Sequence, residues 1–579
     1  MVASTHWLAS ASGMAVLERG GNAFDAAVAA GFVLQVVEPH LNGPGGDMPA
    51  IAYEARQHRM SVLCGQGPAP ALATVEHFRS LGLEQIPGTG LLAPCVPGAV
   101  GAWLTLLRDL GSWRLRDILE LAAGYAQGGH PLLPAVAATI ASVRGLFQGE
   151  WPTSAQVWLK QGQPPAAGEL FSNQALAGTF RRLLSEAEAG RGRENEIEAA
   201  LAAWYEGFVA DAIGEFVRGS RLLDSSGRRH AGLLRADDLA GWRPVWERSC
   251  NTRYGPWRVH KPGPWSQGPV FLQQLALLQA AGLPRLEAGT AEFVHTVVEA
   301  AKLAFADREA WYGDPDFTPD LTPDLMGTGY VQERAALISG DCSWELRPGA
   351  PGGRRPRLPD YGADQRPPHS AGLGDPTFTP AAPRSGDTCH LDVVDRWGNV
   401  VSATPSGGWL QSSPTIPELG FCLGTRAQIF NLTPGLANTV APGKRPRTTL
   451  SPSLAEHEDG LRLAFGTPGA DQQDQWSLSF FVRLAQGGEN LQAAIDAPMF
   501  HTDHFPRSFQ PHDSRPGSLY IEDRAGQAVI EGLRRRGHDV HVQPGWSLGR
   551  ISAAASDSRS GVLTAAANPR GDQGYAVGR

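Results

Sequence analysis

An abrupt change in composition divides the chain beyond its middle. From Ser343 to about Ser385, proline, glycine and arginine dominate, and apolar residues lose any regular spacing. Such a composition is typical of a linker or a mobile loop. Directly after it, residues 390–395 and 400–404 have the pattern of two β-strands joined by a short turn. A predicted β-hairpin therefore begins where the linker ends.

The rest of the chain can form a large folded core. The protein has 579 residues, of which 42% are hydrophobic and 19% charged, as in ordinary globular proteins. Its 50 basic and 58 acidic side chains give a net charge of −8, and no long basic run is present. These values argue against wholesale disorder, and against a nucleic acid or an anionic membrane as the partner.

The N-terminal residues do not have the pattern of a targeting sequence. Residues 1–8 lack a charged start followed by a long apolar run, which is the pattern of a signal peptide. The longest nearly apolar stretch, residues 26–37, is shorter than the roughly 20 residues of a membrane span. We therefore expect a cytoplasmic protein without a membrane segment, in which residues 26–37 form a buried helix.

Local patterns predict two helices and a tightly packed loop. Asn22 can cap a helix that has Asp25 in its first turn and ends before Pro39. Apolar residues at helical spacing over 293–305 indicate a second helix in the core. The glycine-rich loop at 42–47 lacks the spacing of a phosphate-binding loop, which favours close backbone packing near a pocket.

Other catalytic motifs are weak. The six cysteines form no CxxC pair and no HExxH is present, so we expect neither a metal nor a cofactor. Residues 545–549 match the GxSxG elbow of α/β-hydrolases, but no histidine follows His541 to complete a triad. We interpret Ser547 as part of an ordinary turn.

A candidate nucleophile lies between the linker and the hairpin, in Gly386-Asp387-Thr388-Cys389-His390. If the bond before Thr388 is cut, this residue gains an α-amine with a pKa of about 7.7 to 8.0. That amine can act as the base for the residue's own hydroxyl, so one residue supplies nucleophile and base. The alternative is an ordinary turn, and spacing alone leaves both interpretations open.

The same segment resembles the γ-glutamyltransferase (glutathione hydrolase) family. Residues 388–390 and 395–399 are similar to the family's Thr-Thr-His and Asp-x-x-Gly-Asn motifs. Further similar segments follow in family order, at residues 20–27, 37–39, 45–46, 305–308, 313–315, 442–446, 466–469 and 567–570. Because they cover almost the whole chain, chance is a poor explanation.

The resemblance implies an N-terminal-nucleophile hydrolase, made as a precursor that cleaves itself between Asp387 and Thr388. Residues 1–387, with the flexible linker 342–387 at their end, would form the large subunit, and residues 388–579 the small one. The implied fold is α+β, a four-layer αββα sandwich built from both subunits as one unit. The implied partnership is a heterodimer of these subunits, alone or within a higher oligomer.

The resemblance also implies catalytic roles. Thr388 corresponds to the nucleophile, and Ser406 to the hydroxyl residue that bonds the nucleophile's side chain and amine. Gly469 and Ala470 stand where two backbone N–H groups form an oxyanion hole. Alanine at the second position keeps the N–H donor if the backbone conformation is kept.

The expected substrate-binding residues depart from the family pattern. Thr448 and Thr449 stand where the family has two serines that contact the substrate, and their hydroxyls can form the same hydrogen bonds. The alternative interpretation is that both residues serve only strand packing. Gln66 stands where the glutamyl enzymes hold the substrate α-carboxylate with an arginine. The segment expected to bind the α-amine contains no carboxylate. Two cations, Arg426 and Arg447, lie near these positions in the sequence instead.

We therefore expect an amidohydrolase or acyltransferase that acts on a small-molecule amide through an acyl-Thr388 intermediate. Residues 404–413 and 466–476 resemble γ-glutamyltransferase-like proteins and oxamate amidohydrolase more than the glutathione enzymes. Glutathione would then be at best a poor substrate, and an oxamate amidohydrolase-like enzyme acting on a small anionic amide is the alternative. A further alternative is an unprocessed, catalytically idle member that acts as a binding protein.

Overall fold

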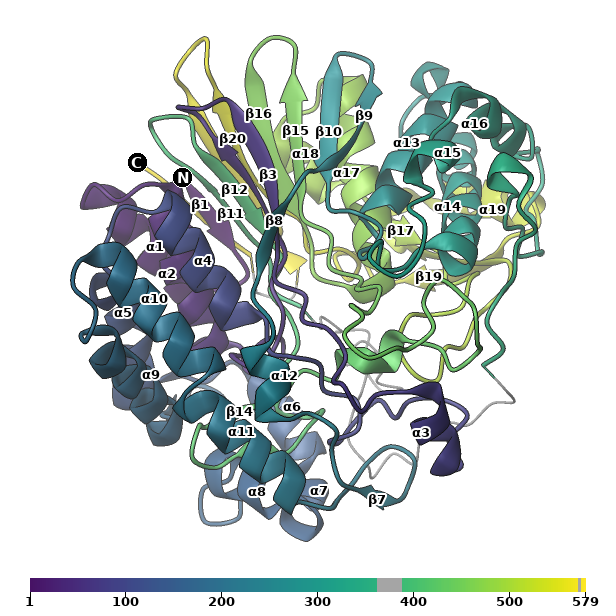
Figure 1. Ribbon diagram of the computed structural model, residues 1–579. Helices are drawn as coiled ribbons and strands as arrows, with labels where there is room; N and C mark the ends of the chain where they lie inside the picture. The colour runs from purple at the N-terminus through teal and green to yellow at the C-terminus, as the bar shows by residue number, and fades with distance from the viewer. Residues whose placement is uncertain (362–387, 571–573) are drawn as a thin grey trace.

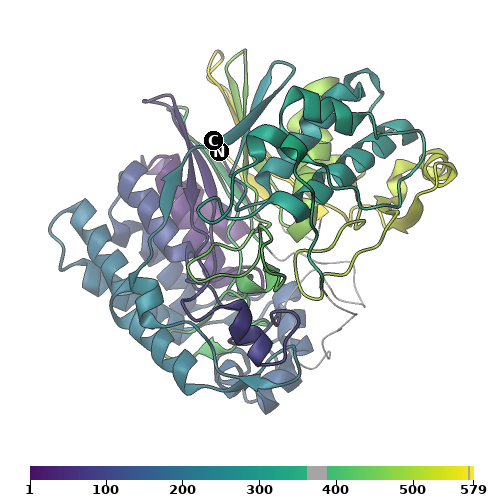
Figure 2. The same ribbon diagram turned by 45° about the vertical axis from the view of Figure 1, so that its right-hand side comes forward.

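Two stacked β-sheets lie between two layers of helices in the computed structural model of the protein (Figures 1 and 2). The structure describes residues 1–361, 388–570 and 574–579. Helices of the N-terminal third cover one sheet, and helices from the middle and C-terminal parts cover the other. The expected α+β fold with four layers is confirmed.

The first sheet joins both ends of the chain to the predicted hairpin. Every pairing between its seven strands is antiparallel. From edge to edge the order is β22 (Tyr575–Val577), β1 (Val2–Ser4), β11 (Leu391–Val394), β12 (Val400–Ala403), β2 (Ala50–Glu54), β3 (Arg59–Cys64) and β8 (Val245–Glu247).

The second sheet is also antiparallel throughout its six strands. Its order is β21 (Leu563–Ala567), β20 (Ser552–Asp557), β16 (Leu461–Gly466), β15 (Ser453–His457), β10 (Trp257–Lys261) and β9 (Cys250–Tyr254). The buried side chains between the sheets form one apolar cluster, which includes Ile51, Val62, Trp265, Val394, Leu454, Ala464 and Ala554.

Each outer helical layer shares a large apolar core with the sheet beneath it. The first layer comprises α1 (Trp7–Glu18), α2 (Ala23–Val37), α4 (Ala99–Leu110), α5 (Leu115–Gly128), α9 (Gln174–Ala187) and α10 (Arg193–Tyr205). The second comprises α13 (Gly268–Ala280), α14 (Ala291–Trp311), α17 (Gln473–Gly487), α18 (Leu491–Asp496) and α19 (Gln527–Arg535).

Smaller elements surround this sandwich. A three-stranded sheet beside α19 contains β17 (Phe500–His501), β18 (Ser518–Glu522) and β19 (Asp539–Gln543). The remaining α-helices of the described residues are α3 (Val75–Ser80), α6 (Pro134–Ser142), α7 (Arg144–Gly149), α8 (Pro152–Trp158), α11 (Phe208–Gly219), α12 (Ala236–Ala240), α15 (Thr322–Leu325) and α16 (Thr328–Ala335).

The helices predicted from local signals are present. Asn22 caps α2 by accepting a hydrogen bond from the Asp25 amide at 2.9 Å, and the Asp25 carboxylate accepts one from the Asn22 amide at 2.9 Å. All 15 residues of α2 are buried, as expected for the apolar stretch at residues 26–37. The stripe at 293–305 lies within α14 and is buried.

The predicted hairpin is formed by β11 and β12. Asp395 shapes its turn, because one carboxylate oxygen accepts hydrogen bonds from the amides of Trp397 at 2.9 Å and Asn399 at 3.0 Å. Of the predicted linker 342–387, only residues 342–361 are described; they include a short 3-10 turn at Pro351–Gly353.

Two further expectations can be compared with the structure. Residues 544–551, which carry the GxSxG match, form turns and irregular backbone between β19 and β20, as predicted. In the part of the chain that the structure describes, no helix has the length and apolar character needed to cross a bilayer.

Candidate active site

Thr388 lies at the head of β11, in the interior of the protein. Its side chain is fully buried, and its backbone forms an antiparallel bridge with Ser406. The Thr388 hydroxyl donates a hydrogen bond to the Ser406 hydroxyl at 3.2 Å. The structure therefore brings the predicted nucleophile and its predicted hydroxyl partner together. Asp387, on the other side of the predicted cleavage bond, lies outside the described residues.

The glycine-rich loop at 42–47 holds Ser406 in place. The Asp47 amide donates a hydrogen bond to the Ser406 carbonyl at 2.8 Å, and the Ser406 amide donates one to the Asp47 carbonyl at 2.9 Å. A Cβ atom on Gly46 would lie 2.1 Å from the Ser406 carbonyl oxygen, so only glycine permits this approach. The expected close packing of this loop is confirmed, and the loop lies against Ser406, the predicted partner of Thr388.

The predicted oxyanion donors lie in a strained turn between β16 and α17. Gly469 has a φ of 129° and Ala470 a φ of 44°, both in the left-handed region. A Cβ on Gly469 would also come within 2.3 Å of the Trp476 ring. Ala470 pays the steric cost of this conformation, roughly 1–2 kcal/mol for an L-residue. Such strain persists only where neighbouring contacts impose it, which is typical of functional sites.

Arg426 lies beside this turn. Ala470 packs in a small buried cluster with Trp409, Ile429 and Phe509. The Arg426 guanidinium lies over two of these rings, 5.5 Å from the centre of Trp409 and 5.6 Å from that of Phe509. Arg426, a predicted substrate-binding residue, and Ala470, a predicted oxyanion residue, therefore contact the same two aromatic rings.

Arg426 forms a buried ion pair with Asp47. Its Nε lies 2.8 Å from Asp47 Oδ2, and its Nη2 donates a hydrogen bond to Oδ1 at 3.1 Å. Burial raises the pKa of Asp47, and the guanidinium opposes that rise. Arg426 Nη1 is buried without a hydrogen-bond partner among the described residues. The predicted cation is therefore balanced by a carboxylate that the sequence-based site missed, although Asp47 directly follows the Gly45-Gly46 motif.

Arg447 belongs to a different group of buried charges. Its Nη2 lies 2.9 Å from Glu309 Oε1, and its Nη1 donates a hydrogen bond to the Arg308 carbonyl at 3.1 Å. Arg308 also pairs with Glu309 and with Asp471, the residue after Ala470. The structure thus connects Arg447 to the oxyanion turn through other side chains, and its direct contact with substrate stays a prediction.

Two of the other three predicted binding residues, Thr449 and Gln66, offer unused polar atoms, whereas the Thr448 hydroxyl accepts a hydrogen bond from the Leu450 amide at 3.4 Å. The Thr448 amide donates a hydrogen bond to the Trp265 carbonyl at 2.9 Å, while the Thr449 hydroxyl is buried and has no partner in the described part of the chain. Gln66 Nε2 donates to the Gly67 carbonyl at 3.0 Å, and its Oε1 is likewise buried without a described partner. Buried polar atoms of this kind call for an explanation, and a bound ligand is one.

A buried carboxyl group contacts the residue next to the predicted nucleophile. Glu38 Oε2 accepts hydrogen bonds from the Thr5 hydroxyl at 2.6 Å and from Cys389 Sγ at 3.0 Å. Burial raises the pKa of Glu38 to about 7, and that of the Cys389 thiol well above its ordinary value. The sequence-based site did not include Glu38, although it lies in the family motif at 37–39.

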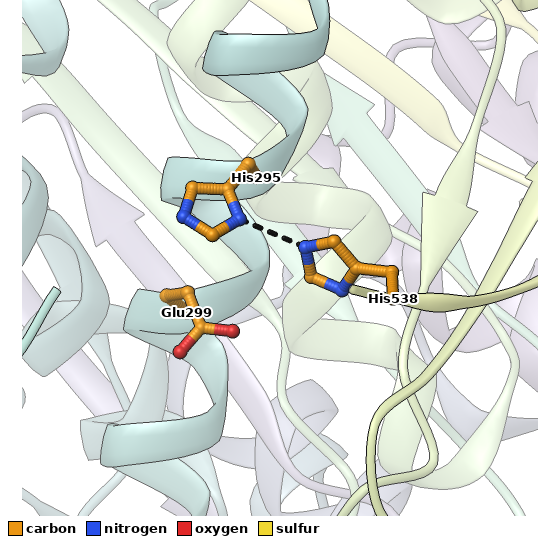
Figure 3. Close-up of side chains that lie close together, drawn as sticks. All are labelled: His295, Glu299 and His538. Atoms are coloured by element: carbon orange, nitrogen blue, oxygen red, sulfur yellow. Dashed lines mark hydrogen bonds between the residues drawn. The ribbon is translucent and has the colours of Figure 1, made fainter. Parts of the chain in front are cut away.

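A second polar cluster joins α14 to the segment after α19 (Figure 3). His295, Glu299 and His538 are buried and offer possible ligand atoms within 4.8 Å of one another. However, His295 Nδ1 and His538 Nε2 are 2.8 Å apart and hydrogen-bonded. Two nitrogens bound to one tetrahedral zinc at about 2.0 Å would lie roughly 3.3 Å apart. The other nitrogen of His295 lies 2.8 Å from the Ser339 carbonyl oxygen.

Lys302 already supplies a positive charge to this cluster. Its Nζ donates hydrogen bonds to Glu299 Oε1 at 2.7 Å, Cys342 Sγ at 3.0 Å and the Ser343 carbonyl at 3.0 Å. Arg347 lies 3.3 Å from the same carboxylate. Two cations on Glu299 oppose a metal ion there by charge repulsion. The cluster fits a hydrogen-bonded contact between two segments, and the expected absence of a metal stays a prediction.

The family model described as gamma-glutamyltranspeptidase matches residues 9–578. The chain belongs to this family. Among curated relatives, the glutathione hydrolase-like YwrD proenzyme of Bacillus subtilis is 29% identical, and the alignment covers 100% of this chain and 98% of that protein. The oxamate amidohydrolase proenzyme of Klebsiella pneumoniae is also 29% identical, over 100% of this chain and 98% of its own.

Solved structures agree with this membership. LmbA2991HD is 53% identical with a TM-score of 0.93, covering 100% of this chain and 98% of that one. Cephalosporin acylase from Bacillus halodurans is 26% identical with a TM-score of 0.81, covering 99% of this chain and 94% of that one. The expected family, its enzymatic class and the N-terminal-nucleophile hydrolase fold are thereby confirmed.

Ala470→Gly tests the strain in the oxyanion turn. Glycine removes roughly 1–2 kcal/mol of steric cost, and it adds unfolded-state entropy worth about 0.4–1 kcal/mol. We therefore expect the free energy of unfolding, measured by urea denaturation, to rise by about 0.5–1 kcal/mol. Ala138→Gly on the exposed face of α6 is the matched control and should lower it by about 1 kcal/mol. Equal losses in both variants would contradict the assignment of strain.

Glu38 should make stability depend on pH. An unfolded Glu titrates near about 4.3, while burial raises the pKa of Glu38 to about 7 in the folded protein. The folded state binds this proton more tightly, so its contribution is complete below about pH 4.3 and is lost as pH rises through about 7. Glu38→Gln should therefore flatten the fall in the free energy of unfolding across this range. The exposed Glu76→Gln control should leave the slope unchanged, and an unchanged slope for Glu38→Gln would refute this assignment.

Proposed function

We propose that this chain is a self-processing amidohydrolase in which Thr388 becomes the N-terminal nucleophile of a small subunit. The observation that carries the proposal is the fully buried Thr388 hydroxyl, 3.2 Å from Ser406 at the head of a central strand. Membership of the gamma-glutamyltranspeptidase family supports it, as do the names of two relatives that are called proenzymes.

Self-cleavage in this proposal begins with attack of the Thr388 hydroxyl oxygen on the carbonyl carbon of Asp387. The peptide C–N bond breaks, an ester bond forms, and the released α-amine takes the hydroxyl proton. Water then hydrolyses the ester, giving residues 1–387 and 388–579. These subunits remain one folded heterodimer, because strands from both parts pair within each large sheet.

The mature enzyme then acts on an amide. The Thr388 α-amine takes the proton of its own hydroxyl, and the oxygen attacks the substrate carbonyl carbon. The Gly469 and Ala470 amides stabilise the negative charge that develops on the carbonyl oxygen. The C–N bond breaks, the leaving amine takes the proton, and water hydrolyses acyl-Thr388. An acceptor amine in place of water gives acyl transfer.

The charges around the nucleophile favour a small anionic amide as the substrate. Arg426 presents Nη1 without a described partner beside the turn that contains Ala470. Gln66 offers only a neutral amide where the glutamyl enzymes use an arginine, and a neutral amide cannot replace a charged, bidentate contact without loss. Oxamate, whose carboxylate is bonded directly to the amide carbon, is the first compound to test. The unused hydroxyl of Thr449 is a further candidate contact.

Thr388→Ala tests processing and catalysis together. Intact-mass spectrometry should find two fragments for the natural sequence, one beginning at Thr388. It should find a single chain of about 61.7 kDa for the variant. The variant should also release no ammonia from oxamate, whereas the Thr388→Ser control, which keeps a hydroxyl, should retain cleavage and activity. A natural chain that stays intact after long incubation would instead support the idle binding protein.

Neutralising the buried ion pair tests the substrate charge. The double variant Asp47→Asn, Arg426→Gln removes both charges, so neither partner is left buried and unpaired. We expect its KM for oxamate to rise about 10- to 100-fold, because losing a charge-assisted hydrogen bond weakens binding by about 1.5–3 kcal/mol. Hydrolysis of oxamide, the neutral analogue, should change little and serves as the control. Equal losses with both compounds, or rapid turnover of γ-glutamyl-p-nitroanilide by the natural enzyme, would contradict an anionic small-amide substrate.

A further inference from the structure

Ala470 is held in its strained conformation from outside the turn. Gln267 lies just before α13, about 200 residues from the turn in sequence, and its Nε2 donates a hydrogen bond to the Ala470 carbonyl at 3.1 Å. Both residues are about 1% exposed. A buried hydrogen bond to the carbonyl of a left-handed alanine opposes rotation of that backbone back to its favoured region.

Arg308 fixes which way the Gln267 amide faces. Arg308 Nη1 donates a hydrogen bond to Gln267 Oε1 at 3.0 Å. A guanidinium has donors and no acceptor, so the oxygen of the amide must face Arg308. The NH₂ group is then directed at the Ala470 carbonyl, which can only accept. The usual ambiguity between oxygen and nitrogen in a glutamine side chain is removed by these two neighbours.

The same arginine also holds the next residue of the turn. Fully buried Arg308 forms ion pairs with Glu309 and Asp471. Asp471 accepts two further hydrogen bonds from Ser508, at 2.8 Å from its amide and 2.6 Å from its hydroxyl. The turn is therefore held at two successive residues, at the Ala470 carbonyl and at the Asp471 carboxylate.

We propose that Gln267, oriented by Arg308, is a positioning residue that keeps Ala470 in the left-handed conformation needed for its amide to serve the reaction. This inference rests on the proposed function, because that function makes the Gly469 and Ala470 amides oxyanion donors. Without the hydrogen bond, Ala470 relaxes toward negative φ and the peptide planes on either side rotate. The amide groups are then misdirected, although no donor has been removed from the protein.

The first test measures the turn without any substrate. Gln267→Ala should speed hydrogen–deuterium exchange in peptides covering residues 466–472, because the turn loses the hydrogen bond to the Ala470 carbonyl. Gln274→Ala is the matched control: Gln274 is also a buried glutamine, lies within α13, and donates to the Asp474 carbonyl at 3.1 Å. Because Asp474 lies beyond the turn, this control should leave exchange at Gly469 and Ala470 unchanged. Equal exchange in the Gln267→Ala variant and the natural protein would overturn the proposal.

The second test measures catalysis on oxamate. Gln267→Ala should lower kcat about 10- to 100-fold, the scale of a misplaced oxyanion donor, and should leave KM nearly unchanged. In the Ala470→Gly background the same substitution should lower kcat about threefold or less, because glycine adopts a positive φ without the steric cost that drives alanine out of it. This rescue separates positioning from a general loss of structure, for which both backgrounds would lose activity equally.

The outcomes also separate this inference from the proposed function. If exchange rises as expected but neither the natural enzyme nor any variant hydrolyses oxamate, the attachment of the turn stands and the choice of substrate fails. If the natural enzyme is active and Gln267→Ala costs the same in both backgrounds, or alters KM alone, the proposed function stands and the positioning role is refuted. Melting temperatures of all variants should be recorded with the kinetics, to confirm that the compared proteins are folded.

Discussion

The pair of backbone hydrogen bonds between Asp47 and Ser406 is the contact on which the site depends. It joins a loop from the N-terminal part of the chain to the residue that receives the Thr388 hydroxyl bond. Gly46 permits the approach, because any side chain there would collide with the Ser406 carbonyl. The same residue, Asp47, then balances the charge of Arg426. One short loop thus fixes both Ser406, the neighbour of the proposed nucleophile, and the cation Arg426.

Buried charge lies on two sides of the proposed active site. Asp47 and Arg426 form one pair, and Arg308, Glu309, Arg447 and Asp471 form a larger group behind the oxyanion turn. Burying charges is costly, and replacing such pairs by apolar residues is often neutral or stabilising for folding alone. Their presence is better explained by orientation: fixed dipoles and charges around a reaction need no reorganisation when charge develops in the transition state.

Local signals in the sequence were sufficient for elements whose stabilising contacts are close in sequence. The cap of α2 joins Asn22 to Asp25, and the turn of the hairpin joins Asp395 to Asn399. The short strands β1 and β22 have no comparable signal, since each has three residues and pairs with distant parts of the chain. The local pattern around Thr388 was equally consistent with an ordinary turn, and only the motif resemblance assigned Thr388 and Ser406 to one site. Those two residues are indeed adjacent in space.

The parts of the site that the sequence did not reveal are contacts between distant segments. Asp47 and Arg426 are 379 positions apart, and Gln267 and Ala470 are 203 apart. No periodicity or cap connects residues over such separations. Arg426 could therefore be identified as a cation near the site, but its partner could not. Likewise, the backbone N–H of Ala470 could be assigned as a donor from the sequence. The strain in its backbone and the side chain that holds it could be seen only in the folded structure.

The order of strands in the two sheets has a consequence for the stability of the protein if it is cleaved as proposed. In the first sheet β1 lies between β11 and β22, and in the second β10 pairs with β15, so segments before and after Thr388 are interleaved. The proposed cut before Thr388 would turn one polypeptide into two, and the shared sheets would hold both in place. Unfolding of the cut protein, however, would separate the pieces, and refolding would then require their encounter and would slow with dilution. An uncut chain would fold only once, as a single polypeptide, and the cut form would be preserved by the height of its unfolding barrier.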